Sequence, residues 1–131
     1  MKKGYFAISF ADRKKFADTI AYLKKELSKN DTELLVFVDN YYFESHQEKE
    51  MMATAFAEID TSDFLIAELT NKSIGVGIEV GYAFATNKPI IYIRQKEAPY
   101  STTTAGCSEV VLEYKNKTDL VAQVSKALKL I

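Results

Sequence analysis

The chain has 131 residues, of which 47% are hydrophobic and 27% charged, and its formal net charge is −1. This length is typical of one domain with its own core, so we expect a single domain over residues 1–131. A near-neutral chain argues against nucleic-acid binding, and one cysteine with one histidine excludes an intrachain disulfide and disfavours a metal site.

The first part of the chain predicts two strands and the helix between them. "YFAISF" (5–10) is a short β-rich run, and residues 12–28 have apolar positions at helical spacing, with Asp12 as the expected N-cap. The apolar run 33–39 predicts a second strand, and the polar and aromatic stretch 40–47 a loop. No apolar run reaches membrane-spanning length, and the start lacks a signal-peptide pattern, so we expect a cytoplasmic protein without a membrane partner.

The rest of the chain continues the alternation. Residues 48–60 predict a helix and 63–69 a buried strand, after which a glycine-rich turn leads into a helix from about 77 to 87. The remaining elements are, in order, a strand, a polar loop, a strand and an amphipathic helix, at 88–95, 96–108, 109–114 and 117–130.

Five apolar strands that alternate with helices predict an α/β fold. The expected architecture is a doubly wound, flavodoxin-like parallel sheet in the order 2-1-3-4-5, with helices on both faces. Ligands of such sheets bind beyond the carboxyl ends of the strands, near the switch point between strands 1 and 3. The segments expected at that edge are 9–13, 39–46, 68–79 and 94–104.

The stretch "NKSIGVGIEVGYAF" (71–84) carries the chemistry at this edge. Gly75 and Gly77 predict a tight turn that would let a ligand reach the backbone, and Gly81 would let the helix pack closely on the sheet. The pattern is one residue longer than the dinucleotide fingerprint and follows strand 3, so it indicates no dinucleotide cofactor. Glu79 is expected in the first turn of the helix, where the positive end favours its ionised form by about 0.3–1 kcal/mol.

An ionised carboxylate in that position suits nucleophilic attack. Cleavage at the anomeric carbon of a sugar passes through an oxocarbenium-like state and uses a carboxylate of this kind. The alternative is that Glu79 only complements the helix dipole.

The segment "SDFLIAELTNKSIGVGIEVGYAFATNKPIIYI" (62–93) resembles the nucleoside 2-deoxyribosyltransferase superfamily, and within it the 2'-deoxynucleoside 5'-phosphate N-hydrolases. "YFAIS" (5–9) is similar to the first strand and turn of that family. The resemblance implies that Glu79 is the nucleophile, which attacks C1' of the deoxyribose and expels the base. The covalent intermediate is then released to water in hydrolases, or to another base in transferases.

The resemblance also assigns roles to other positions. Ser73, six residues before the nucleophile, matches a phosphate-binding serine of the hydrolases, whereas the transferases carry an aspartate there. Ser9 matches a second phosphate-binding serine, and Tyr5 an active-site tyrosine near the sugar. A hydroxyl from the loop after strand 4, lent by a neighbouring subunit, completes the phosphate site, for which Ser101, Thr102, Thr103 and Thr104 are candidates. A homodimer or larger assembly with shared sites is therefore implied.

Two positions depart from the family pattern. The second carboxylate of the family, which assists the nucleophile and the departing base, falls on Ala55. The residues that could replace it are Asp39, Glu44, Glu58 and Glu68. A family arginine is matched by Ala11, with Arg13 two residues later as the candidate for the phosphate. This departure predicts either weaker phosphate binding than in the closest relatives or an unphosphorylated nucleoside as the substrate.

Three other features have less weight. His46 is expected to be a solvated loop histidine, although it could protonate a leaving base. Cys107 is interpreted as a small buried residue. The aromatic run Tyr41, Tyr42 and Phe43 is expected partly at a subunit interface and partly over the ligand.

The sequence therefore predicts an N-glycosidic-bond enzyme that needs no cofactor and acts on a small-molecule nucleoside or nucleotide. The leading hypothesis is hydrolysis of 2'-deoxynucleosides or their 5'-monophosphates through Glu79. One alternative is transfer of deoxyribose between bases. The other, suggested by Ala55, is a nucleotide-binding sensor domain without turnover.

Overall fold

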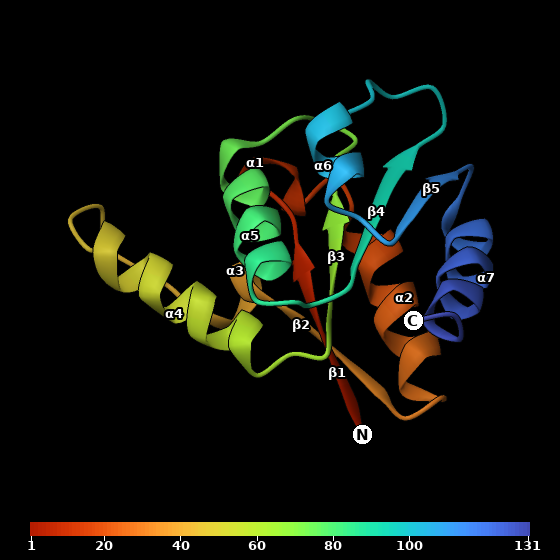
Figure 1. Cartoon of the computed structure of the whole chain (residues 1–131), viewed down its shortest axis with the longest axis horizontal. Helices are drawn as coiled ribbons and strands as arrows, with labels where there is room; N and C mark the ends of the chain where they lie inside the picture. The colour runs from red at the N-terminus through yellow and green to blue at the C-terminus, as the bar shows by residue number, and fades with distance from the viewer.

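A computed structural model of the chain describes residues 1–131 and shows a five-stranded sheet between two layers of helices (Figure 1). All strands are parallel, and their order is β2-β1-β3-β4-β5, which confirms the predicted fold and topology. The strands are β1 (Lys2–Ala7), β2 (Thr32–Val36), β3 (Phe64–Glu68), β4 (Ile90–Gln95) and β5 (Val110–Tyr114).

Helices precede or follow each strand. They are α1 (Phe10–Arg13), α2 (Ala17–Ser28), α3 (Phe37–Asn40), α4 (Glu48–Asp60), α5 (Ile74–Ala85), α6 (Thr102–Gly106) and α7 (Lys117–Leu128). None of them combines the length and the apolar character that a membrane crossing requires.

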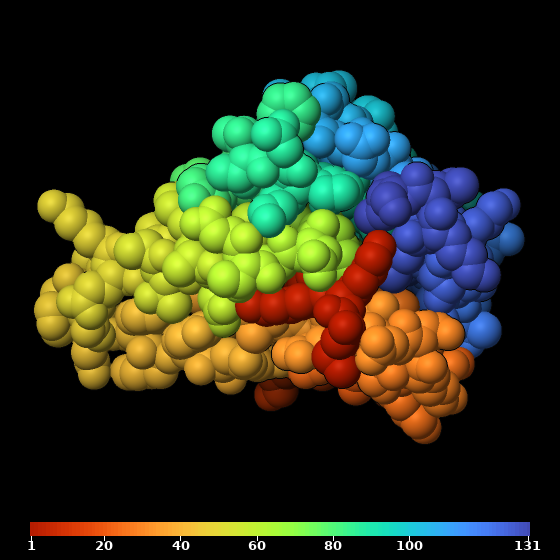
Figure 2. All heavy atoms as spheres, turned by 60° about the horizontal axis from the view of Figure 1, so that its bottom comes forward, coloured from red at the N-terminus to blue at the C-terminus, as the bar shows by residue number.

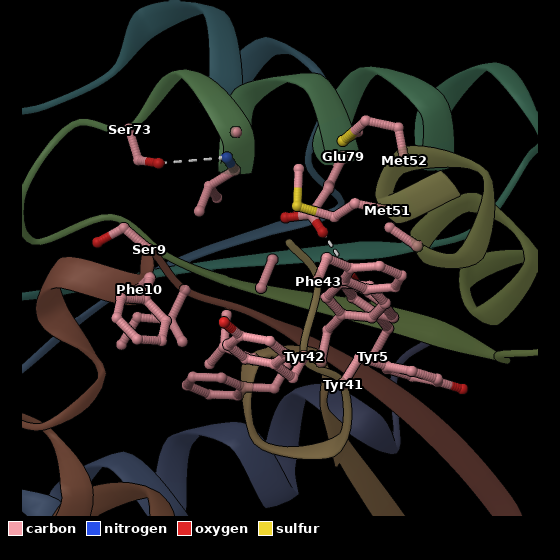
Figure 3. Close-up of a pocket in the computed structure, with 18 residues that line it drawn as sticks. Tyr5, Ser9, Phe10, Tyr41, Tyr42, Phe43, Met51, Met52, Ser73 and Glu79 are labelled. Carbon is pink, nitrogen blue, oxygen red and sulfur yellow. Dashed lines mark hydrogen bonds between the residues drawn. The ribbon is translucent and has the colours of Figure 1, made fainter. Parts of the chain in front are cut away.

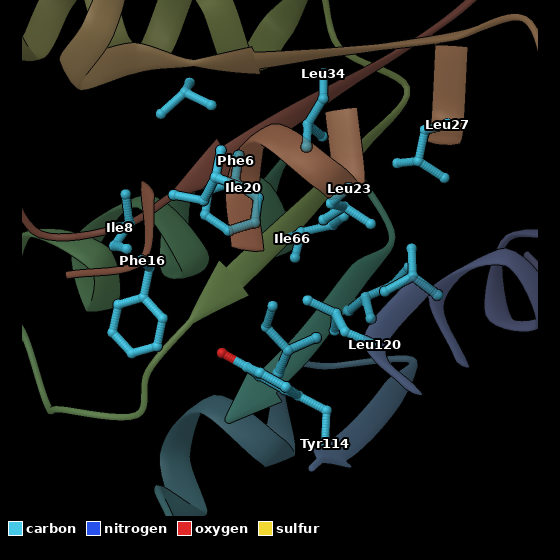
Figure 4. Packing of buried hydrophobic residues seen from close by; sticks show 14 of the residues in the cluster. Phe6, Ile8, Phe16, Ile20, Leu23, Leu27, Leu34, Ile66, Tyr114 and Leu120 are labelled. Carbon is cyan, nitrogen blue, oxygen red and sulfur yellow. The ribbon is translucent and has the colours of Figure 1, made fainter. Parts of the chain in front are cut away.

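Side chains that alternate along the strands divide the core into two layers. On one face α2 and α7 cover the sheet, and Phe6 and Ile66 pack against Leu23 and Leu120 there (Figure 4). On the other face α4 and α5 cover the sheet. Tyr5 belongs to that second layer because its neighbour in β1, Phe6, points to the first. The strand period thus directs Tyr5 towards the helix that carries Glu79.

The predicted helix over 12–28 is in fact two helices. α1 ends at Arg13 and α2 begins at Ala17. Asp12 is not the N-cap: Ser9 is, and its Oγ accepts a hydrogen bond from the backbone N–H of Asp12 at 3.2 Å. The hydroxyl satisfies a donor that the first helical turn leaves free, so the helix begins directly after strand β1.

The turn predicted at Gly75 and Gly77 is part of helix α5 instead. Ser73 caps α5, so the helix begins at Ile74 and contains all three glycines, none of which has a positive φ. Glu79 therefore lies in the second turn rather than the first. Gly81 is exposed, with open space around it, so it does not serve close packing on the sheet.

Two short helices were not predicted. The strand expected over 33–39 ends at Val36, and α3 occupies the residues before the predicted loop 40–47. α3 follows β2 directly, and α6 lies in the hydroxyl-rich loop, where Ser101 caps it by accepting from the N–H of Thr104 at 3.2 Å. The segment 41–52, which comprises the loop between α3 and α4 and the first residues of α4, projects from one side of the molecule, as the yellow atoms of Figure 2 show.

Candidate active site

A cavity of about 430 Å³ opens at the carboxyl edge of the sheet, between the ends of β1 and β2, the segment 41–52 and the first turns of α5 (Figure 3). Seven of the 18 residues that line it are aromatic: Tyr5, Phe6, Phe10, Phe37, Tyr41, Tyr42 and Phe43. The polar groups besides the phenols are Ser9, Ser73 and Glu79. An aromatic cavity with a few polar groups is the usual form of a small-molecule site.

Glu79 and Tyr5 meet inside this cavity. The carboxylate points from α5 into the cavity, and the phenol of Tyr5 donates a short hydrogen bond to its Oε2 (Figure 3). The Tyr5 side chain is fully buried, whereas Glu79 is half-buried and keeps contact with the open space. The structure thus brings together the two residues that the sequence assigned to the reaction.

The pKa of Glu79 is raised, whereas the sequence predicted that the positive end of the helix would favour the ionised form. Burial raises the pKa of its carboxyl group to about 7, and the hydrogen bond from Tyr5 offsets part of that increase. The helix dipole acts mainly on the first turn, which is why it does not hold the pKa of Glu79 low in the second. Burial and the adjacent Glu79 raise the pKa of Tyr5, so this phenol stays protonated and donates to the carboxylate.

Two serine hydroxyls lie at the opposite end of the cavity from Met51 and Met52 (Figure 3). Ser9 caps α1, and Ser73 caps α5 by accepting from the N–H of Val76 at 3.3 Å. Each hydroxyl uses its oxygen as an acceptor and keeps its O–H free to donate to a ligand. Gly75 lies beside Ser73 and leaves the backbone of the first turn open.

The other phosphate candidates lie elsewhere in this chain. Ser101, Thr103 and Gly77 line a second cavity of about 280 Å³, which shares Ser73 with the first. That cavity also contains Lys72. Within one chain these hydroxyls are therefore separated from Glu79, and only Ser73 faces both cavities.

Arg13 lies outside the wall of either cavity. Its guanidinium makes two hydrogen bonds of 2.7 Å to the carboxylate of Asp39. This bidentate pair joins α1 to α3, and both side chains remain partly exposed.

The possible substitutes for the second carboxylate do not line the cavity. Ala55 does line it and is buried. Glu58 accepts instead from Lys3 at 3.0 Å and from the Tyr41 hydroxyl at 2.8 Å. Glu68 lies buried among Thr70 and Tyr114, which donate to it at 2.9 and 2.6 Å. Asp39 is paired with Arg13, and Glu44 is an exposed loop residue.

Sequence reasoning missed part of the wall. Phe10, Phe37, Met51 and Met52 were not identified as lining a site. Their apolar character gave no sign of a cavity, because the same residues would fit a core. Cys107 is half-buried rather than buried, and His46 is exposed in its loop as expected. No three His, Cys, Asp or Glu side chains are grouped so that they could hold a metal ion.

Comparisons with known proteins identify the family and the fold. The model of the nucleoside 2-deoxyribosyltransferase family matches residues 5–124. No curated protein matches the sequence with significance. The structure is similar to a CMP N-glycosidase from Clostridium botulinum, with 21% identity, a TM-score of 0.73 and coverage of 96% of this chain and 99% of that one.

Two further solved structures share the fold. A conserved protein from Enterococcus faecalis has 19% identity and a TM-score of 0.76, covering 97% of this chain and 99% of its own. A 2-deoxyribosyltransferase from Bacillus psychrosaccharolyticus has 11% identity and a TM-score of 0.69, and the match covers 91% of this chain and 90% of the transferase chain. By the family match over most of its length, the chain belongs to the nucleoside 2-deoxyribosyltransferase family.

Proposed function

We propose that this protein hydrolyses the N-glycosidic bond of 2'-deoxynucleosides or their 5'-monophosphates, with Glu79 as the nucleophile. The observation that carries the proposal is the carboxylate of Glu79, which points into an aromatic cavity and is held by Tyr5. An aromatic wall suits a planar base, and the half-exposed carboxylate suits attack on the sugar carbon beside it. The similar fold of a CMP N-glycosidase supports the hydrolytic form.

The proposed reaction has two steps. An oxygen of Glu79 bonds to C1' while the bond from C1' to the base nitrogen breaks, and the base leaves with the electron pair. Water then attacks C1' of the glycosyl ester, which returns the carboxylate and releases the sugar, while the second proton of the water goes through solvent to the departed base. The hydroxyls of Ser9 and Ser73 would hold the anionic end of a nucleotide, together with the open first turn of α5.

The decisive experiment is replacement of the nucleophile. Glu79→Gln should lower base release by at least about 10³-fold, because it removes the group that forms the bond. Glu48→Gln, in an exposed position of α4, is the matched control and should release base at the wild-type rate. Chromatography of deoxynucleosides, ribonucleosides and their monophosphates measures the free base, and circular dichroism checks the fold. Wild-type turnover by Glu79→Gln would refute the mechanism.

Deoxyribose transfer is the second candidate. The family match and the transferase among the similar structures favour it. Incubation of a deoxynucleoside with a second free base separates the two reactions, because only a transferase forms the exchanged nucleoside.

Ligand binding without turnover is the third candidate, because Ala55 occupies the wall of the cavity. Calorimetry that shows tight nucleotide binding, with no free base after hours, would favour this candidate over both enzymes.

We also propose that two copies of the chain associate, as the family resemblance implies. Ile74, Ile78 and Phe84 on α5 support this proposal, since they are 85%, 48% and 56% exposed. A second copy on this face would cover them. Light scattering of the wild type and of Ile78→Asp tests it: a dimer that becomes a monomer is the expected result, and a monomeric wild type would refute the association.

A further inference from the structure

The charge of the cavity wall is unbalanced. Glu79 is its one carboxylic acid, and no lysine, arginine or histidine lies in the wall. Arg13, the cation on neighbouring α1, is neutralised by Asp39 at 2.7 Å. When Glu79 is ionised, the cavity therefore presents a negative charge in a low-polarity surrounding, which favours a positively charged ligand.

Besides the nucleophile, the wall has no carboxylic acid that could give a proton to a leaving base, and its other O–H groups, the phenols and the serine hydroxyls, are weak acids. A neutral base departs with an extra electron pair and needs a proton, and a positioned general acid contributes about 10²–10⁴-fold to such a step. Ala55 presents a methyl group to the cavity. The hydroxyls of Tyr5 and Tyr41 donate to Glu79 and Glu58, and these contacts help raise the pKa of both phenols.

We propose that this cavity takes N-glycosides whose base is a cationic heteroaromatic ring, an N-alkylated purine or a pyridinium, which leaves as a neutral molecule. The inference rests on the proposed N-hydrolase function and names its substrate class. A cationic ring needs no acid, because it already carries the positive charge that protonation would supply.

The aromatic wall supports the same class of ring. Phe37, Tyr41 and Phe43 form one cluster, with ring centroids 4.9 Å apart between Phe37 and Tyr41 and 6.0 Å apart between Tyr41 and Phe43. Aromatic faces attract cations, most strongly where water is excluded. Met51 and Met52 complete this end of the wall with polarisable sulfur atoms.

The step balances without a further reactant. The carboxylate oxygen of Glu79 forms a bond to C1', and the bond from C1' to the ring nitrogen breaks. Its electron pair goes to the ring, which becomes neutral, and the product is a neutral glycosyl ester. Water hydrolyses the ester, one of its protons goes to solvent, and the carboxylate returns to its ionised form.

Kinetics with a matched pair of substrates tests the inference. We would compare 2'-deoxyguanosine 5'-monophosphate with its N7-methyl derivative, after subtracting spontaneous base loss. Wild type should release N7-methylguanine with a higher kcat/KM than guanine. Ala55→Asp should raise guanine release by about 10²–10⁴-fold, and N7-methylguanine release far less, because only the neutral base uses the added acid. Ala53→Asp, on an exposed position of α4, is the control and should change neither rate.

An equal gain for both substrates in Ala55→Asp would overturn the inference, and so would wild-type release of guanine at the rate of N7-methylguanine. Release from neutral substrates only would overturn it while leaving the N-hydrolase function in place. Release from neither class would overturn both.

A second measurement does not depend on whether Ala55→Asp folds. It compares the binding of two rings that carry no sugar and therefore cannot react. At about pH 8, where Glu79 is ionised, 1-methylnicotinamide should bind about tenfold more tightly than neutral nicotinamide by calorimetry. Glu79→Gln should abolish that preference. Equal affinities of the two rings for the wild type would overturn the inference.

Discussion

The phenol of Tyr5 donates to the carboxylate of Glu79 from an interior strand of the sheet. Strand β1 is paired on both sides, and Tyr5 lies opposite Leu35 of β2 and Leu65 of β3. The backbone therefore fixes the position of the phenol, and the carboxylate on α5 is held against a rigid partner. Pre-organisation of this kind reduces the ordering that a reaction requires.

The pH dependence of base release should report this contact. The nucleophile must be ionised, and the pKa of Glu79 is about 7, so kcat/KM should rise with pH through that value. Tyr5→Phe removes a donor that stabilises the ionised form, so the pKa of Glu79 should increase and the rising limb should move to higher pH. At neutral pH, kcat/KM should then fall about tenfold for each unit of displacement.

Tyr82→Phe is the control for this profile, since Tyr82 donates to Asp60 outside the cavity. The rise of kcat/KM with pH in Tyr82→Phe should coincide with that of the wild type. A limb that stays in place in Tyr5→Phe would show that the phenol does not set the ionisation of Glu79.

The same pKa predicts how stability changes with pH. Burial raises the pKa of Glu79 above its ordinary value of 4.5, so the folded state binds this proton more tightly than the unfolded state. That stabilisation is complete below about pH 4.5 and is lost as pH rises through about 7. The free energy of unfolding of the wild type should therefore fall relative to Glu79→Gln, by on the order of 2 kcal/mol across this range.

Urea denaturation of both proteins at a series of pH values measures that difference. Glu68, whose pKa burial also raises, is present in both proteins, so its contribution cancels in the comparison. A difference that does not vary between about pH 4.5 and 8 would contradict the assigned pKa.

Ser73 should affect nucleotides more than nucleosides. Ser73→Ala removes a hydroxyl that can donate to a phosphate, so KM for a 5'-monophosphate should rise about tenfold or more while KM for the nucleoside stays nearly unchanged. The substitution also removes the cap of α5, at a cost of about 1 kcal/mol in stability.

Asn116→Ala separates these two effects. Asn116 caps α7 by accepting from the N–H of Asp119 at 2.9 Å, and it lies outside both cavities. It should lower stability by about the same amount and leave both KM values unchanged. An equal rise in KM for nucleoside and monophosphate in Ser73→Ala would argue against phosphate contact.

Gly4 should tolerate no side chain. It precedes Tyr5 in β1, and a Cβ atom there would overlap the ring of Phe64 in the paired strand. Gly4→Ala should lower the free energy of unfolding by about 1–3 kcal/mol, as overpacking does. The double variant Gly4→Ala with Phe64→Leu should recover part of that loss.

Gly106→Ala is the matched control, since no atom beyond its chain neighbours and the backbone of its own helix lies within 4 Å of its added Cβ. Its urea midpoint should stay within about 0.5 kcal/mol of the wild type. An unchanged midpoint in Gly4→Ala would mean that β1 can move away from Phe64.

Strong periodicity made the sheet predictable. Each of the five strands is an apolar run, and right-handed connections leave few ways to order them. The same topology brought Tyr5, Ser9, Ser73 and Glu79 to one edge, because all four follow or lie near the ends of β1 and β3.

The local choice between turn and helix near Glu79, and the burial of its side chain, were harder to predict. The glycines near Glu79 indicated a turn, but the cap at Ser73 and the burial of Val76 and Val80 favour a helix instead. The raised pKa of Glu79 depends on how deeply the folded chain buries its carboxyl group, which no spacing in the sequence reveals. The separation of Arg13 from the cavity likewise follows from its pairing with Asp39.

The reacting pair and the surface that would recognise the base come from different parts of the chain. Tyr5 and Glu79 belong to the sheet and to α5, whereas Tyr41, Tyr42, Phe43, Met51 and Met52 all lie in the projecting segment 41–52. A dozen consecutive residues can thus change without disturbing the bond-breaking groups. Selectivity in this architecture can diverge by exchange of one peptide, while the reacting groups stay in place on the interior strand β1 and on α5.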